Sequence, residues 1–312
     1  MNAQPKTRRR VSMTRPDGKS IRRRPDERLQ ARGARCEELT AAEEPDVLDF
    51  LARRPIHTFG MAGFIRANGL VSPHNRGKFY AYRNDAGALE GVALIGHFIL
   101  FEALSEAAIA AFARLAQDCC GLNMLLGEEG KVQTFWRYYS ERGRPARLYC
   151  RELLLELRWP MEVHDEAQGL RPATIDDLDL IVPAHAQSAF DDSGIDPLQA
   201  DPVGFRQRCA RRVTQGQTWV WVEDGKLLFK ADIITDTPEV VYLEGVWVNP
   251  LERRKGYGLC CMSQLSKDCL KRTGSVCLLV NEQFQSAQAF YKKAGYKFIS
   301  NYDTIFLEQN AN

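Results

Sequence analysis

The stretch "NPLERRKGYGLCCMSQL", residues 249–265, joins a run typical of a strand to a run with helical spacing. Before it, "VVYLEGVWVNP" (240–250) predicts a buried strand. The first N–H groups of a helix have no intrahelical acceptor, so such a junction is a natural anion site. Two glycines would let a ligand approach the backbone, and three cations add charge. The predicted anion loop comprises Arg253, Arg254, Lys255, Gly256, Tyr257, Gly258 and Leu259.

Two other readings of this junction are weaker. A dinucleotide-binding loop would need a third glycine at position 261, where Cys261 stands. The second reading is a basic turn whose glycines serve packing alone. Because a strand precedes the loop and an amphipathic helix follows it, the sequence favours the anion site.

Length and composition predict a soluble, cytoplasmic protein. The chain has 312 residues, 45% of them apolar, which suffices for two ordinary domains or one large one. No apolar run approaches the length of a membrane span, and no apolar block marks a secretory signal at the start. The nine cysteines lack CxxC or metal-ligand spacing, so we expect reduced thiols and no metal site.

The charge is concentrated at the start of the chain. Residues 1–35 hold twelve Lys or Arg and three acids, a net charge of +9; with +2 overall, the rest carries −7. Such a segment cannot bury enough surface to fold alone, so a disordered basic tail is expected over 1–38. A solvated extension is favoured over contact with nucleic acid or an acidic partner, and over an organelle transit peptide.

The remainder predicts two mixed α/β halves of similar element order. We expect a first domain at 39–160, a linker at 161–168 and a second domain at 169–312. The first half offers a helix at 41–53, a hairpin around 84–87 whose second strand runs on to 102, and a helix capped by Ser105. The second offers an N-cap at Thr174 and a hairpin at Asp224-Gly225. "FWRYYSERG" (135–143) and "AFYKKAG" (289–295) occupy corresponding places.

Arg253-x-x-Gly256-x-Gly258, after "LEGVWVNP", resembles the acyl-coenzyme A motif of GNAT N-acetyltransferases. Residues 280–296, "VNEQFQSAQAFYKKAGY", are similar to the end of that fold. "LRPAT", "FKADI", "FLARRPIH" and "RGKFYAYR" resemble tandem GNAT proteins whose first domain has no defined function. The resemblance implies an α/β fold of two tandem GNAT-like domains, each a mixed, largely antiparallel sheet flanked by helices. The first half lacks the motif, which suggests a non-catalytic copy.

The resemblance also implies acetyl-CoA as co-substrate. Its pyrophosphate would bind the loop at 253–259, and its pantetheine arm would pair with Val246, Trp247 and Val248. A backbone N–H of this strand would hold the developing oxyanion while an amine attacks the thioester directly. Asn281 would contact the cofactor, although Phe284 replaces a second Asn common in the family.

Two proton transfers need side chains. Tyr291 matches the family's usual general acid, the alternative being a packed aromatic. Glu244 lies two residues before Val246 and is therefore expected on the same strand face as a general base, the alternative being a solvated strand residue. Asp191, Asp192 and Asp196 fall where GNAT folds place variable substrate-side segments, and would attract a cationic amine.

The sequence favours an acetyl-CoA-dependent N-acetyltransferase acting on a primary amine of a small molecule or protein. Two alternatives stay open: a GNAT-fold sensor or scaffold that binds acyl-CoA without turnover, and a tandem-GNAT aminoacyl transferase. Neither the acceptor nor the oligomeric state follows from the sequence.

Overall fold

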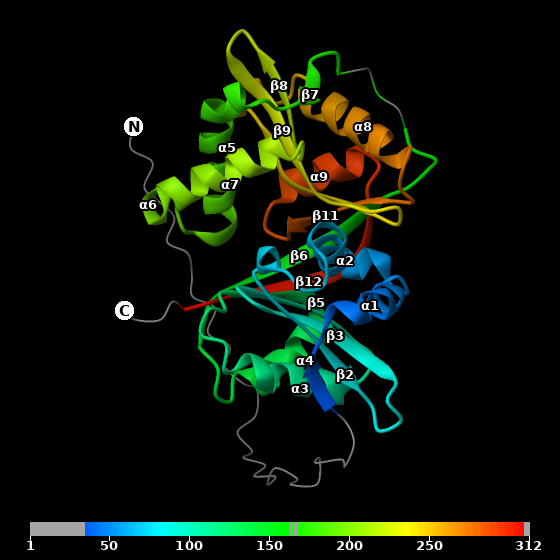
Figure 1. Cartoon of the computed structure of the whole chain (residues 1–312). Coiled ribbons are helices and arrows are strands. Elements are labelled where there is room, and N and C mark those ends of the chain that lie inside the picture. The colour runs from blue at the N-terminus through cyan, green and yellow to red at the C-terminus, as the bar shows by residue number, and fades with distance from the viewer. Residues whose placement is uncertain (1–34, 163, 165–166, 309–312) are drawn as a thin grey trace, which may run out of the picture. The chain divides into compact units, whose positions relative to one another are not determined.

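The computed structural model describes residues 35–162, 164 and 167–308, all within the compact unit Gly33–Asn312. Their strands form one twelve-stranded mixed sheet in the order β1-β2-β3-β4-β5-β12-β6-β11-β10-β9-β8-β7 (Figure 1). The first half contains β1 (Arg35–Glu38), α1 (Glu44–Leu51), α2 (Pro55–Asn68), β2 (Gly77–Arg83), β3 (Leu89–Gly96), β4 (Phe98–Ala103), α3 (Glu106–Ala116), β5 (Met124–Glu128), α4 (Glu129–Tyr139) and β6 (Ala146–Leu157).

The second half repeats this order. It contains β7 (Leu170–Pro172), α5 (Leu178–Ser193), α6 (Pro197–Ala200), α7 (Pro202–Thr214), β8 (Thr218–Glu223), β9 (Lys226–Asp236), β10 (Val241–Val248), α8 (Tyr257–Leu270), β11 (Val276–Asn281), α9 (Gln285–Lys293) and β12 (Lys297–Leu307). In both halves a strand, helix, parallel strand, helix and final strand follow one another, which confirms the predicted correspondence of α4 with α9.

Local signals act as the sequence indicates. Ser105 accepts a hydrogen bond from the Ala108 N–H and caps α3, and Thr174 begins a capping box with Asp177. The hairpin at Asp224-Gly225 joins β8 to β9. The predicted single strand running to residue 102 is instead β3 and β4, divided at Gly96. There the backbone turns tightly, and a Cβ would lie 2.2 Å from the Arg76 carbonyl oxygen.

The predicted tail ends earlier than expected. Residues 35–38 form β1, which pairs antiparallel with β2. The rest of the tail lies outside the described residues, as do 163 and 165–166 of the predicted linker.

The two halves exchange their last strands. β6 lies between β12 and β11, and β12 lies between β5 and β6, side by side in Figure 1. Glu152 of β6 therefore pairs with Asn281 of β11 on one side and with Tyr302 of β12 on the other. Since pairing runs across both halves, the boundaries 39–160, 161–168 and 169–312 remain predictions.

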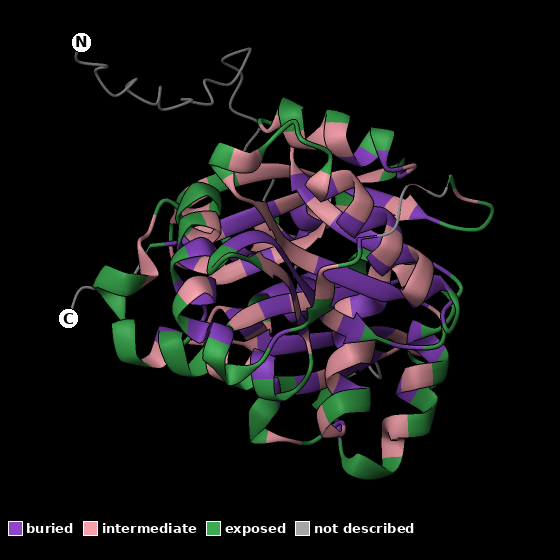
Figure 2. Cartoon of the chain, turned by 90° about the horizontal axis from the view of Figure 1, so that it is seen from above, coloured by how far each residue is buried: buried purple, intermediate pink, exposed green. Residues whose placement is uncertain are grey.

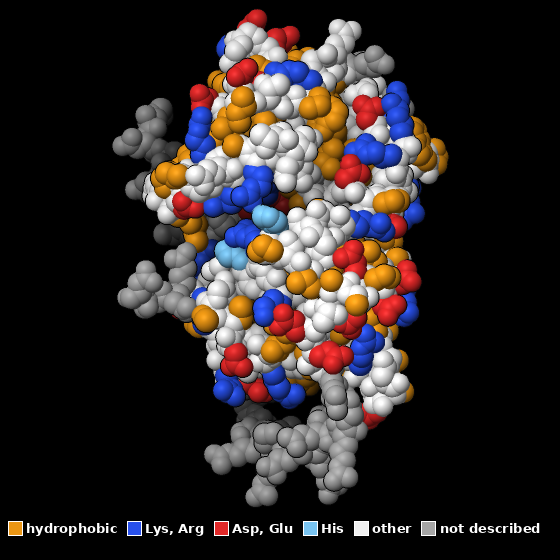
Figure 3. Space-filling view, in the orientation of Figure 1, with side chains coloured by type: hydrophobic (Ala, Val, Ile, Leu, Met, Phe, Trp, Pro, Cys, Tyr) orange, Lys and Arg blue, Asp and Glu red, His pale blue; other side chains and the backbone are white. Residues whose placement is uncertain are grey.

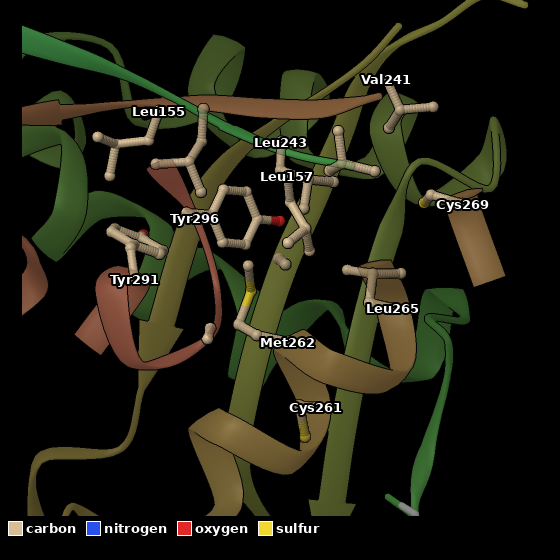
Figure 4. Close-up of a cluster of buried hydrophobic side chains, with 14 of the residues drawn as sticks. Leu155, Leu157, Val241, Leu243, Cys261, Met262, Leu265, Cys269, Tyr291 and Tyr296 are labelled. Atoms are coloured by element: carbon tan, nitrogen blue, oxygen red, sulfur yellow. The ribbon is translucent and has the colours of Figure 1, made fainter. Parts of the chain in front are cut away.

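Buried side chains concentrate in the strands and on the inner sides of the helices (Figure 2). In the second half, α8 and α9 cover one face of the sheet through an apolar cluster that includes Leu243, Met262 and Tyr291 (Figure 4). On the other face, α2 of the first half reaches the second half. Phe59 of α2 stacks on Tyr242 of β10 with ring centroids 4.2 Å apart.

Candidate active site

The predicted anion loop lies at the start of α8. Gly256 is the N-cap with φ 94°, a left-handed conformation that favours glycine, and it offers no side chain to cap the helix. The N–H groups of Tyr257 and Gly258 donate to no acceptor in the described part of the chain. Gly258 packs so closely on β10 that a Cβ would lie 2.9 Å from Val248. The exposed end of α8 can therefore receive an anion at its backbone.

The cations before α8 differ in their surroundings. Lys255 donates to Glu252 at 2.6 Å, so part of the charge of the loop is neutralised. The Nε of Arg253 donates to the Val248 carbonyl at 3.3 Å, which fastens the loop to the end of β10. Arg254 has φ 67° and is exposed.

β10 and β11 diverge at the middle of the sheet. They pair in parallel only from Val241 to Leu243, opposite Val276 to Leu278. Beyond Leu243, β10 pairs with β9 at Glu244, Trp247 and Val248 but no longer with β11, while β11 stays paired with β6 to Asn281. The edge of β10 that carries Val246, Trp247 and Val248 is thus open to an added partner.

A β-bulge at Gly245 changes which face Glu244 occupies. The register with β9 shifts between Glu244 and Trp247, and Gly245 has φ 58°. Val246 packs with the cluster beneath α8 and α9, whereas Glu244 binds Arg212 of α7 on the opposite face. The expectation that Glu244 shares a face with Val246 is therefore wrong, because a bulge interrupts strand alternation.

On the face that α5 and α7 cover, Glu152, Asp192 and Glu244 lie near enough for their charges to interact. Burial raises the pKa of Glu152 to about 7, despite a hydrogen bond from Thr304, and the charges of Asp192 and Glu244 contribute. Loss of surrounding water raises the pKa of Asp192 to about 6, with repulsion from Glu244. We call Glu152, Asp192 and Glu244 the acidic cluster. Such mutually repelling carboxylates favour binding of a cation.

Tyr291 lies on the other face, between α9 and the strands. Its ring packs among buried apolar side chains, 5.9 Å from that of Tyr296 (Figure 4). Burial raises its pKa well above the usual range, and the charge of Asp192 adds to this shift. The electrostatic influence of Asp192 thus reaches Tyr291 from the opposite face, where β10 and β11 diverge.

A buried charge network supports the bulge. Lys230, 1% exposed, donates to Asp232 at 2.6 Å and to the Gly245 carbonyl at 3.2 Å. Arg212 forms ion pairs with both Asp232, at 2.9 Å, and Glu244, at 3.2 Å. Although burial opposes its ionisation, the charges of Lys230 and Arg212 hold the pKa of Asp232 at about 2. Burial and these same cations lower the pKa of His185 to about 3.

Other predicted residues have local roles here. Asn281 accepts from the Gln283 N–H at 2.9 Å and so shapes the turn into α9. Asp196 caps α6 through the Leu198 N–H, and Asp191 accepts from Gln187. Of the three predicted substrate aspartates, Asp192 alone belongs to the acidic cluster. Sequence reasoning missed Glu152 and Arg212; the only signal for Glu152 was a carboxylate inside the apolar run "RELLLEL".

Across the described ranges, no group of three or more His, Cys, Asp or Glu could hold a metal ion. No described helix is long and apolar enough to cross a membrane.

Residues 184–296, just over a third of the chain, match the model of the "Acetyltransferase (GNAT) family". No curated protein matches the sequence. Among solved structures, a Drosophila protein aligns with a TM-score of 0.64 and 15% identity, covering 89% of this chain and all of its own. A tandem GNAT protein from the clavulanic acid biosynthesis pathway aligns with a TM-score of 0.53 and 12% identity, covering 89% of this chain and 99% of its own.

A GCN5-related N-acetyltransferase from Sphaerobacter thermophilus also aligns with a TM-score of 0.53 and 12% identity, covering 89% of this chain and 96% of its own. At such identities these structures show the fold alone. The fold class predicted from the sequence is confirmed. The described chain has a mixed α/β fold of two GNAT-like halves, and its segment 184–296 is similar in sequence to the GNAT acetyltransferases.

Proposed function

We propose that the protein is an N-acetyltransferase that transfers the acetyl group of acetyl-CoA to a primary amine by direct attack. One observation carries the proposal. The gap between β10 and β11 has an uncapped helix start on one side of the sheet and the acidic cluster on the other. A thioester and a cationic amine could therefore approach the same gap from opposite faces.

The cofactor half of the site would use backbone groups. The N–H groups at Tyr257 and Gly258 would bind the pyrophosphate, with Arg253, Arg254 and Lys255 adding charge around it. The open edge of β10 at Val246, Trp247 and Val248 would pair with the pantetheine arm. A backbone N–H beside the bulge would then donate to the developing oxyanion.

The acceptor half would use the acidic cluster. Its three carboxylates would hold an ammonium, and one must remove a proton before attack. A general base works best with a pKa near the operating pH, which favours Glu152, whose pKa is about 7. Glu244, which is bound by Arg212, would instead add negative charge around the amine. Asp192, whose pKa is raised to about 6, would bind the ammonium beside Glu152 and Glu244.

Tyr291 would protonate the departing thiolate. This role rests on its match to the family's usual general acid; burial raises its pKa, which keeps the phenol protonated at neutral pH but also makes it a weaker acid. No covalent enzyme intermediate is required. Cys261, Cys269 and Cys277 are buried, and burial raises the pKa of each thiol, which opposes a nucleophilic role.

Calorimetry with acetyl-CoA tests the loop. Gly256→Asp puts a carboxylate and a strained backbone at the helix start, so we expect the affinity to fall at least about 100-fold. Gly225→Asp, at an exposed hairpin turn with φ 71°, is a matched control that should bind as wild type does. Equal affinity in wild type and Gly256→Asp would refute the loop assignment.

A thiol-release assay over primary amines tests the chemistry. Turnover that falls in both Tyr291→Phe and Glu152→Gln, with cofactor affinity retained, supports the proposal. Cofactor binding without turnover on any amine would favour the sensor or scaffold instead.

A further inference from the structure

Four basic side chains lie close together between α7 and the first half. Arg208 and Arg211 project from α7, Arg76 precedes β2, and His97 occupies the turn between β3 and β4; all four are exposed. We call them the arginine patch. Figure 3 shows Lys, Arg and His side chains gathered between α7 and the first half, on the face seen there.

The backbone presents Arg76 rigidly. Arg76 has φ 57°, a conformation uncommon for a residue with a side chain. Its carbonyl accepts from the His97 N–H at 2.8 Å, which ties two members of the patch together. The preceding Asn75 is fully buried and donates to the Gly69 carbonyl at 2.9 Å. The fold thus fixes the backbone at Arg76 although its side chain is exposed.

The charges of the patch are poorly compensated. Partial loss of surrounding water and repulsion from Arg208 and Arg211 lower the pKa of Arg76. Partial loss of water and the charges of Arg76 and Arg208 likewise lower the pKa of His97. Asp201 pairs with Arg208 at 2.9 Å, but no ion pair in the described ranges includes Arg76 or Arg211. Cations that repel one another without a counter-charge attract an anion.

The patch adjoins the acceptor half of the proposed site. Arg211 directly precedes Arg212, and Arg208 lies one helical turn before it. Arg212 in turn binds Glu244 of the acidic cluster at 3.2 Å. One molecule could therefore present an amine to the acidic cluster and a negative group to the arginine patch.

We propose that the arginine patch binds a carboxylate or phosphate carried by the amine acceptor. This inference rests on the proposed N-acetyltransferase activity and defines its substrate class: primary amines with an anionic group. Three arginines suit one or two oxyanions, since guanidinium groups pair with them bidentately. A long polyanion would need a wider basic surface, whereas residues 36–312 carry a net charge of −7. The first half would then contribute Arg76 and His97 to acceptor recognition.

Paired acceptors test the inference. Glycine and glycinamide, or phosphoethanolamine and ethanolamine, differ only in the anionic group. We expect wild type to prefer the anionic member by about tenfold or more in kcat/KM. Arg76→Gln and Arg211→Gln should lose this preference through a higher KM for the anionic member alone. Arg206→Gln, on the same helix but paired with Asp179 at 2.7 Å, is the matched control. Equal use of both members by wild type, or equal losses in the control, would overturn the inference.

A binding measurement separates this inference from the proposed activity. Inorganic phosphate is titrated into Gly256→Asp, so that the α8 loop does not compete, and into the same variant carrying Arg76→Gln and Arg211→Gln. Saturable binding that the arginine substitutions abolish supports the patch even if no amine is acetylated. Absence of binding contradicts the inference whatever the activity. A short single-stranded RNA that binds these arginines more tightly than phosphate would also overturn it, in favour of a nucleic-acid partner.

Discussion

Both halves of the chain contain a parallel strand pair that diverges, but the two openings are filled differently. In the first half, β4 and β5 pair only at Phe98–Met124 and Ile99–Leu125. Beyond this point, Arg54 bridges Glu102 at 3.1 Å and Glu128 at 2.7 Å, and Lys131 binds both carboxylates. The opening between β10 and β11 instead faces the acidic cluster, where one cation, Arg212, binds Glu244.

The helices that follow these strand pairs differ in the same way. α3 begins at a serine whose side chain accepts from the helix, so one of its free N–H groups is satisfied internally. α8 begins at Gly256, without a side-chain cap. The connection to α3 is also two residues long, too short for a phosphate loop.

The two openings also shift carboxylate pKa values in opposite directions. Burial would raise the pKa of Glu128, but Arg54, His57 and Lys131 hold it at about 2. Burial raises that of Glu152 to about 7, and no ion pair found among the described residues includes this carboxylate. Neutralised charges stabilise a fold, whereas uncompensated ones cost stability and are typical of functional sites. We therefore propose a structural role for the first opening and place the proposed chemistry at the second.

The largest effect is expected from Lys230→Met. The substitution leaves the buried Asp232 with Arg212 as its remaining arginine or lysine partner, beside the Thr218 hydroxyl, and it releases the Gly245 carbonyl. Removing one partner of a buried ion pair costs about 3–5 kcal/mol, so we expect the unfolding free energy of this variant to fall by that amount. Urea denaturation measures the change. Because the bulge loses its support, kcat should also fall while acetyl-CoA affinity stays near that of wild type.

The double variant Lys230→Met, Asp232→Leu separates these two effects. Replacing both members of a buried pair by apolar groups can restore stability. If Lys230 supports the bulge, kcat should stay low after stability recovers. A double variant with restored stability and full kcat would show that Lys230 acts on folding alone.

Arg54→Met tests the first opening. It leaves the buried Glu102 with Lys131, and Glu128 with Lys131 and His57. Since Arg54 is 34% exposed, we expect a loss of about 2 kcal/mol in unfolding free energy rather than the full cost of a buried pair. Arg53→Met, at the exposed neighbouring position, is the control. A fall in turnover at unchanged stability would contradict the structural role.

Sequence patterns predicted local features more reliably than they predicted which strands lie side by side. The α8 start, the caps at Ser105 and Thr174 and the hairpin at Asp224-Gly225 depend on neighbouring residues, and the structure contains each of them. The strand exchange and the Gly245 bulge depend on distant pairing. Strand alternation indicates which face is buried but not which strand lies beside it. This is why Glu152, brought to β11 by β6, was missed, and why Glu244 was assigned to the wrong face.

Glu152→Gln should change stability only at higher pH, and in the opposite direction from the other substitutions. The pKa of Glu152 is raised in the folded protein from 4.5 to about 7, so the folded state resists ionisation. Wild-type stability due to this group is complete below pH 4.5 and is lost as the pH rises to about 7. The variant cannot ionise, so at about 1.4 kcal/mol per pKa unit it should be up to about 3 kcal/mol more stable at pH 8 and equal to wild type at pH 4. Its acetyl transfer should be slow and lose the rise in kcat/KM between pH 6 and about 7 that the wild-type carboxylate gives.

Glu156→Gln, on the same strand and paired with Arg158, is the control and should change neither profile. A Glu152→Gln enzyme with wild-type pH dependence would instead place the proton transfer on Asp192 or Glu244, and the second opening would keep its acidity without needing this residue.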